Sequence, residues 1–153
     1  MKCPLWTAAL LAGVAIAIGA EAQQIKPETQ IKLRKSAYAL MNFNFDAIDQ
    51  MLEGKRAFNK DEAIRRADVV ALIATQPKEF FGPGTDSAAG ETRAKPEIWT
   101  KRADFDAKMD KLVQETSKLP QAARADQAAL KKQMNDVEAA CKACHDDYRV
   151  KKN

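Results

Sequence analysis

Residues 130–148, LKKQMNDVEAACKACHDDY, repeat apolar or cysteine side chains in steps of three and four. This spacing places them on one face of a helix, and such a face needs partner helices to bury it. The members of the face are Leu130, Met134, Val137, Cys141, Cys144 and Tyr148. The helix that carries them is expected to run from about Gln121 or Ala122 to Val150.

Three further helices are expected upstream, and strand signals are nearly absent. They cover residues 27–52, 60–75 and 97–119, with a long irregular connection over 80–96. Gly54, Pro77 and Pro120 follow their ends, as helix-stopping residues do. The first helix has its own apolar face: Ile31, Arg34, Tyr38, Met41, Phe45, Ile48 and Leu52. Two short links and one long one predict an all-α, antiparallel four-helix bundle.

The pattern Cys141-Lys142-Ala143-Cys144-His145 is typical of covalent haem c attachment. Each thiol can form a thioether with a haem vinyl group, and the imidazole can bind the iron. Three alternatives compete: a thioredoxin-like pair, a disulfide within the motif, and a zinc site that borrows Asp146 or Asp147. The first lacks its strand–helix context, and the second would close too small a loop to stabilise much.

The N-terminus is typical of a secretory signal peptide. Lys2 is followed by the apolar run 8–20 and by Ala20-Glu21-Ala22, a small-x-small cleavage pattern. A membrane-spanning helix needs about 20 apolar residues, so an uncleaved anchor is the weaker alternative. We expect residues 1–22 to be removed, with Cys3 among them, and residues 23–153 to form one exported domain with no membrane association.

The single histidine excludes a second imidazole as the sixth iron ligand. Among the methionines, Met41 on the first apolar face is the one serious candidate, and methionine ligation is typical of electron carriers. Tyr38, one turn earlier, could cover the iron without binding it. Arg34 interrupts the apolar face, and it either extends its charged head to solvent or pairs with a haem propionate.

The mature sequence resembles the cytochromes c′, the class II c-type cytochromes of bacteria. The resemblance is carried, in order, by residues 26–28 (KPE), 31–35 (IKLRK), 81–85 (FGPGT), 95–99 (KPEIW) and 141–149 (CKACHDDYR). It implies the four-helix bundle, one covalent haem near the C-terminal end, and His145 as the proximal ligand. Low-spin relatives carry a methionine at the position that corresponds to Tyr38, whereas high-spin members carry a bulky residue that does not bind iron.

The resemblance therefore implies a five-coordinate, high-spin haem with Tyr38 as its distal cover, and it strengthens the propionate role of Arg34. Lys142 and Arg149 are expected near the proximal side of His145. The family is associated with periplasmic nitric oxide binding, nitric oxide resistance and electron transfer. Its members are often homodimers through the first two helices, where Phe43 could contribute.

We therefore expect a periplasmic haem protein that binds nitric oxide and carbon monoxide, with no catalytic residues and at most weak turnover of nitric oxide. The alternative is a low-spin electron carrier with Met41 bound to iron. A peroxidase-like enzyme lacks its distal acid–base pair. The net charge of +4 comes from interspersed charges, which disfavours nucleic-acid binding and leaves any redox partner unidentified.

Overall fold

The computed structural model describes residues 25–151, and it is helical over most of that range. The predicted signal peptide lies outside the described residues. In chain order the helices are α1 (Pro27–Leu52), α2 (Lys60–Ala74), a 3₁₀ turn η1 (Pro77–Phe80), α3 (Glu97–Thr100), α4 (Arg102–Thr116), α5 (Leu119–Ala125) and α6 (Gln127–Tyr148). Within this range no helix combines the length and hydropathy that crossing a bilayer requires.

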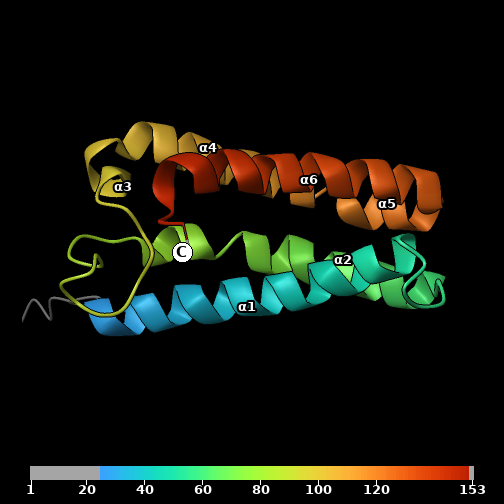
Figure 1. The fold of residues 1–153 in the computed structure, drawn as a ribbon, viewed down its shortest axis with the longest axis horizontal. Helices are drawn as coiled ribbons and strands as arrows, with labels where there is room; N and C mark the ends of the chain where they lie inside the picture. Colours follow the sequence, from blue (N-terminus) through green and yellow to red (C-terminus); the bar gives the residue numbers. More distant parts are fainter. Residues whose placement is uncertain (1–24, 152–153) are drawn as a thin grey trace, which may run out of the picture.

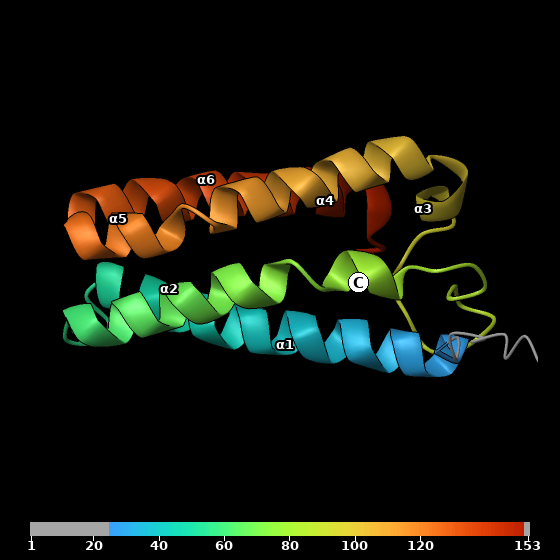
Figure 2. The ribbon, with the colours of Figure 1, turned by 180° about the vertical axis from the view of Figure 1, so that it is seen from behind.

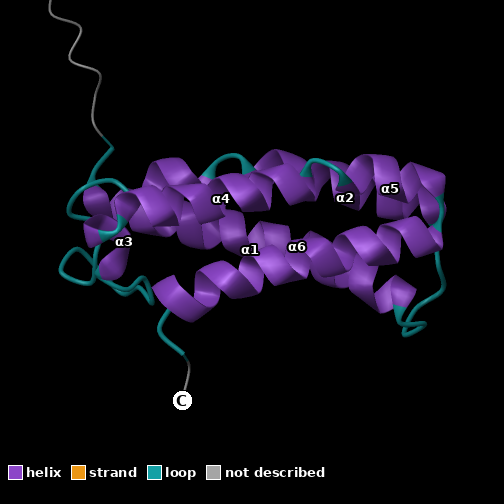
Figure 3. Ribbon diagram, turned by 90° about the horizontal axis from the view of Figure 1, so that it is seen from above, coloured by secondary structure: helices purple, strands orange, loops and turns teal. Residues whose placement is uncertain are grey.

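The long helices form an antiparallel bundle of two layers. Figure 1 shows α1 and α2 side by side in one layer, with α4, α5 and α6 in the other. Figure 2 shows the same pairing from behind, and Figure 3 shows the longer connections at the two ends of the bundle, with short ones partway along it. The segment 81–96 lies at the end where α1 begins and α6 finishes. The predicted all-α four-helix bundle is confirmed.

The ends of α1, α2 and α6 follow from local chemistry. Gly54 has a φ of +74°, and the amides of Gly54 and Lys55 donate back to the carbonyls of Met51 and Gln50. This is the Schellman arrangement that closes a helix. The side chain of Asn59 accepts from the Glu62 amide at the start of α2. Asp126 caps α6 in the same way, by accepting from Ala129 at 2.8 Å.

The bounds of the last two predicted helices are wrong. The helix expected over 97–119 is interrupted at Lys101, whose φ of −117° and ψ of 45° leave the helical region, and it ends at Thr116. Pro120 does not end a helix but lies in the first turn of α5, where a missing amide hydrogen costs nothing. The extended backbone of Asp126 then separates α5 from α6, which therefore begins at Gln127 and ends at Tyr148.

The core confirms the two predicted helix faces. Ile31, Met41 and Ile48 of α1 are buried, as are Leu130, Met134, Val137 and Tyr148 of α6. One cluster fills the middle and far end of the bundle around Ile48, Leu119 and Leu130. A second, built on Phe81, Phe105 and Tyr148, lies near the 81–96 segment, and Tyr38 packs against both.

One acidic side chain is buried between α4 and α6. Glu115 accepts hydrogen bonds from Lys111 at 2.6 Å, Lys118 at 2.8 Å and Gln133 at 3.0 Å. These donors, Lys111 first, lower the pKa of the carboxyl to about 2. A carboxyl with a depressed folded-state pKa stabilises the fold above its unfolded pKa of about 4.3, and this contribution is lost as the pH falls through the folded value.

We therefore expect Glu115→Gln to lose part of the acid sensitivity of the fold. Between about pH 4.5 and pH 2, the free energy of unfolding should fall less steeply in the variant than in the parent protein. Urea denaturation at a series of pH values measures this. Asp136→Asn, at the exposed pair with Lys132, is the matched control. Parallel curves for Glu115→Gln and the parent would contradict the assignment.

Candidate functional site

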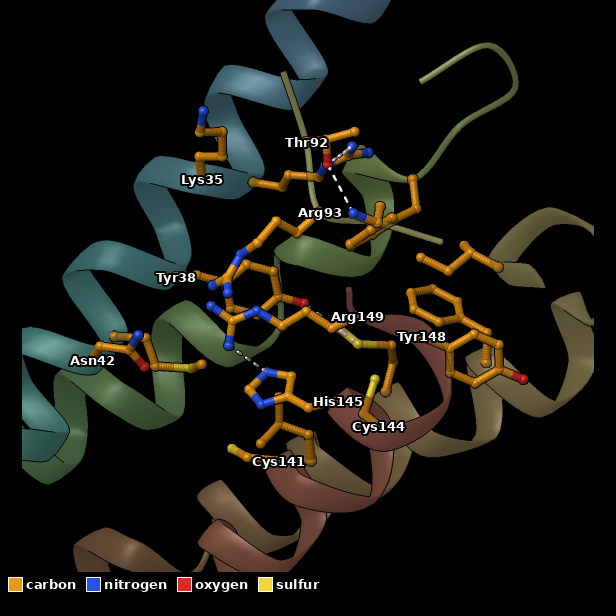
Figure 4. Close-up of a pocket in the computed structure, with 18 of the residues that line it drawn as sticks. Lys35, Tyr38, Asn42, Thr92, Arg93, Cys141, Cys144, His145, Tyr148 and Arg149 are labelled. Carbon is orange, nitrogen blue, oxygen red and sulfur yellow. Dashed lines mark hydrogen bonds between the residues drawn. The ribbon is translucent and has the colours of Figure 1, made fainter. Parts of the chain in front are cut away.

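A cavity of about 470 Å³ opens between α1, α4, α6 and the segment 91–94 (Figure 4). Pockets for small molecules and cofactors typically enclose about 300–1,000 Å³. Most of the wall is apolar and belongs to the two core clusters. Its apolar members include Met41, Phe81, Ile98, Phe105, Met109, Leu112 and Tyr148. The cavity therefore suits a largely apolar guest of cofactor size.

The three chemically active groups of the motif reach the cavity from one side of α6. Cys141 and Cys144 are partly buried and free, and His145 lies beside them (Figure 4). Burial, as the main cause, raises the pKa of each thiol to about 11, so both are protonated at neutral pH. Desolvation first, and then the charge of Arg93, lower the pKa of His145, which favours its neutral, metal-binding form.

The competing interpretations of the motif find little support. The two cysteines form no disulfide. Asp146 pairs with Lys142, and Asp147 pairs with Lys108 at 3.1 Å, so both carboxylates already have cationic partners. Across residues 25–151 no group of three or more His, Cys, Asp or Glu side chains converges as a metal site would require. The motif therefore remains available for a guest in the cavity.

Arg149 lies against the ring of His145, as expected from its position one turn later. Its Nη1 is 3.5 Å from His145 Nε2. An arginine can only donate, so a hydrogen bond between these atoms would use the neutral tautomer of His145 with an unprotonated Nε2, a form that can bind a metal. The backbone around Arg149 is fixed by an antiparallel bridge to Ala94, in which Lys95 N donates to Tyr148 O and Val150 N to Arg93 O.

Tyr38 and Met41 reach the same cavity from α1, across from His145. The Tyr38 hydroxyl donates to the sulfur of Met109 at 3.6 Å. Burial first, and then Cys144 and Cys141, raise the pKa of the phenol, while Arg34 offsets this only in part. The phenol is therefore neutral near pH 7. Met41 is buried in the larger core cluster.

Arg34 does not extend to solvent, because it is only 2% exposed. Its Nη1 donates to Phe80 O and Thr85 Oγ1, and its Nη2 donates to Thr85 O and Thr92 Oγ1, at 2.7–3.3 Å. The guanidinium also stacks on Phe81, 4.6 Å from the ring centre. Arg34 thus ties the 80–92 segment to α1, and its pairing with a propionate stays a prediction.

Lys35, Thr92 and Arg93 line the cavity but were not identified from the sequence. Lys35 lies in the quoted motif 31–35, but no role in the site was assigned to it. Thr92 and Arg93 lie in the 81–96 connection, which has no helical periodicity to reveal which side chains face inward. For Thr92 and Arg93, the only sequence signal of a role in the site was their nearness to residues 95–99, one of the quoted motifs.

The residues present fit a covalently bound haem. Two free thiols and one imidazole project from the same turns of α6, as two thioethers and one axial bond require. Most of the wall is apolar, as the faces of a porphyrin require, and Lys35, Arg93 and Arg149 bring positive charge to the cavity.

Comparisons with known proteins agree with this fit to a covalently bound haem. The family model described as Cytochrome C' matches residues 29–149. A cytochrome c′ of Allochromatium vinosum is 36% identical over 149 residues, which cover 95% of this chain and 96% of that protein. The solved cytochrome c prime from Shewanella frigidimarina is 35% identical, with a TM-score of 0.80, over 84% of this chain and 100% of the other. A nitric oxide complex of a mutant cytochrome c prime from Alcaligenes xylosoxidans is also 35% identical, with a TM-score of 0.77, over 85% and 100% of the two chains.

Proposed function

This chain belongs to the cytochrome c′ family, and we propose that it is an exported cytochrome whose five-coordinate haem binds nitric oxide and carbon monoxide. As a member of the family, it carries one covalently bound haem c. When bound, that group supplies an iron centre that takes up diatomic ligands. The remaining roles fall to residues of this chain.

In this proposal Cys141 and Cys144 would hold the haem through the two thioethers, and His145 would bind its iron through Nε2. Arg149, which now contacts that nitrogen, would withdraw from it and stay on the proximal side. The bridge to Ala94 keeps the Arg149 backbone there. No residue is assigned a catalytic role, since carrying a gas needs none.

The five-coordinate assignment rests on the position of the Tyr38 ring and on the protonation of its phenol. Its ring stands at the cavity on α1, its hydroxyl is engaged by Met109, and burial keeps the phenol protonated. A neutral phenol is a poor iron ligand, whereas its bulk covers the distal side. A ligand that binds iron tightly can displace such a ring, and a mutant of the relative from Alcaligenes xylosoxidans was solved as a nitric oxide complex.

The second candidate function is electron transfer by a low-spin haem with Met41 bound. Met41 does line the cavity, which keeps this alternative open. Its side chain is 5% exposed and packed in the larger core cluster. Met41 would therefore have to leave this cluster in order to bind the iron. We therefore favour gas binding over methionine ligation.

Export to the periplasm and dimerisation are parts of the proposal. The predicted signal peptide supports export. The outer side of α1 and α2 exposes large apolar side chains: Leu33, Leu40, Phe43, Val69 and Leu72. A second copy of the chain could cover them, and one solved cytochrome c′, 32% identical, is described by its ligand-controlled dimer dissociation.

Titration of the reduced protein with carbon monoxide tests the proposed function. We expect a carbonyl spectrum with one ligand bound per chain, because Tyr38 can move from the vacant iron position. The ferrous protein in the absence of ligand is the baseline. A reduced spectrum unchanged by saturating carbon monoxide and by nitric oxide would contradict gas binding.

A further inference from the structure

The residues at the mouth of the cavity include more cationic side chains than carboxylates. Lys35, Arg93 and Arg149 line it, together with one acid, Glu91. Among the described residues, none of the three cations forms an ion pair with a carboxylate. Figure 4 shows Lys35 and the Thr92–Arg93 segment at the edge of the cavity away from Cys141 and Cys144.

The position of these cations matches the chemistry of the guest. In haem the two vinyl groups and the two propionates lie at opposite edges of the macrocycle. Thioethers to Cys141 and Cys144 would hold the vinyl edge at α6, which would leave the carboxylate edge to the lining residues of α1 and of the 91–94 segment. That edge would otherwise place two negative charges in a mostly apolar cavity, where an unpaired charge is costly.

Arg34 is poorly placed to balance those charges. Its four hydrogen bonds use both hydrogens of Nη1 and both of Nη2, and only the Nε hydrogen is left. A guanidinium binds a carboxylate best through two parallel bonds. Arg34 would have to release Thr85 or Thr92 to make them, and both help to hold the loop.

The side chain of Arg93, unlike that of Arg34, is available to bind a carboxylate. Its backbone is fixed at the cavity edge, because its carbonyl accepts from Val150 N at 2.8 Å and its neighbour Thr92 is held by Arg34. Its side chain is half-buried and makes no ion pair with a described carboxylate. Lys35 lies beside this segment, with its Nζ 3.4 Å from the carbonyl oxygen of Glu91.

We propose that Arg93, with Lys35 beside it, pairs with the haem propionates, and that Arg34 is a positioning residue that holds the loop carrying Arg93. The inference rests on the proposed haem site and goes beyond it, since it replaces the pairing predicted from the sequence. Arg93 can form the two parallel bonds, whereas Lys35 acts as a single point charge.

The test compares holoproteins carrying Arg93→Gln or Lys35→Gln with two controls. Arg65→Gln and Lys32→Gln remove the same charges from exposed positions on α2 and α1 that do not line the cavity. The readouts are the propionate bending band in the resonance Raman spectrum, the midpoint potential and the thermal midpoint. Haem content and carbon monoxide binding are measured on every sample.

We expect Arg93→Gln to shift the propionate band and to lower the midpoint potential at least twice as much as either control, because a cation beside the ferric haem is lost. Lys35→Gln should have a smaller effect of the same sign. Both variants should keep their thermal midpoint, whereas Arg34→Gln should lower it. An unshifted band in both Arg93→Gln and Lys35→Gln, with haem and gas binding intact, would overturn the inference. A parent protein that binds no gas would instead refute the proposed function.

Discussion

Replacing Cys141 and Cys144 together by alanine is expected to abolish covalent haem attachment. The described part of the chain has no other thiol that could form a thioether. Cys3 lies in the predicted signal peptide and is lost when that peptide is cleaved. After acid–acetone extraction, the parent protein should retain its haem and the double variant should lose all of it. Mass spectrometry of the chain measures this directly, as a haem-sized mass difference between the two.

The matched control is Met134→Leu, a buried, volume-conserving change on the same face of α6. It should retain the full haem mass. Single alanine variants of Cys141 or Cys144 should keep one thioether each. Full covalent haem in the double variant would contradict the assignment of these residues.

Replacing Tyr38 by alanine is expected to speed carbon monoxide binding to the reduced protein by about 10- to 100-fold. Moving a buried aromatic side chain costs about 1.5–3 kcal/mol, and each 1.36 kcal/mol of barrier is a factor of ten in rate. In the variant, no ring has to leave the distal side before the ligand enters. Flash photolysis or stopped-flow mixing gives the association rate constant.

Met41→Leu is the matched control for this prediction, because it keeps the volume at a neighbouring position on the same wall. It should leave both the association rate and the absorption spectrum near those of the parent. The competing electron-carrier function predicts the reverse, with a large spectral change in Met41→Leu and little change in Tyr38→Ala. The two variants therefore separate the candidate functions.

Local signals were sufficient to predict much of the fold. The bounds of α1 follow from Pro27 at its start and Gly54 beyond its end, and the observed helix has those bounds. Periodicity identified both buried faces, because side chains three and four apart on a helix lie together. The separate helix α5 was missed, since proline can begin a helix as readily as it ends one. The break at Lys101 was missed because no glycine or proline marks it.

The grouping of Cys141, Cys144 and His145 was also predictable, because these residues lie within one short motif on one helix. The apolar faces of α1 and α6 predicted that Tyr38 and Met41 would meet them across the bundle, and all five residues line the same cavity. The rim of the cavity was not predictable. Arg93 reaches it only because Arg34 fixes Thr92 and the C-terminal segment pairs with residues 93–95, contacts between positions far apart in the sequence.

Absorption and electron paramagnetic resonance spectra of the resting ferric protein near pH 7 test the proposed haem coordination most directly. We expect a five-coordinate, high-spin haem, with His145 as its only protein ligand and Tyr38 covering the open side. A six-coordinate, low-spin spectrum with a far-red methionine-to-iron charge-transfer band would contradict it and would place Met41 on the iron.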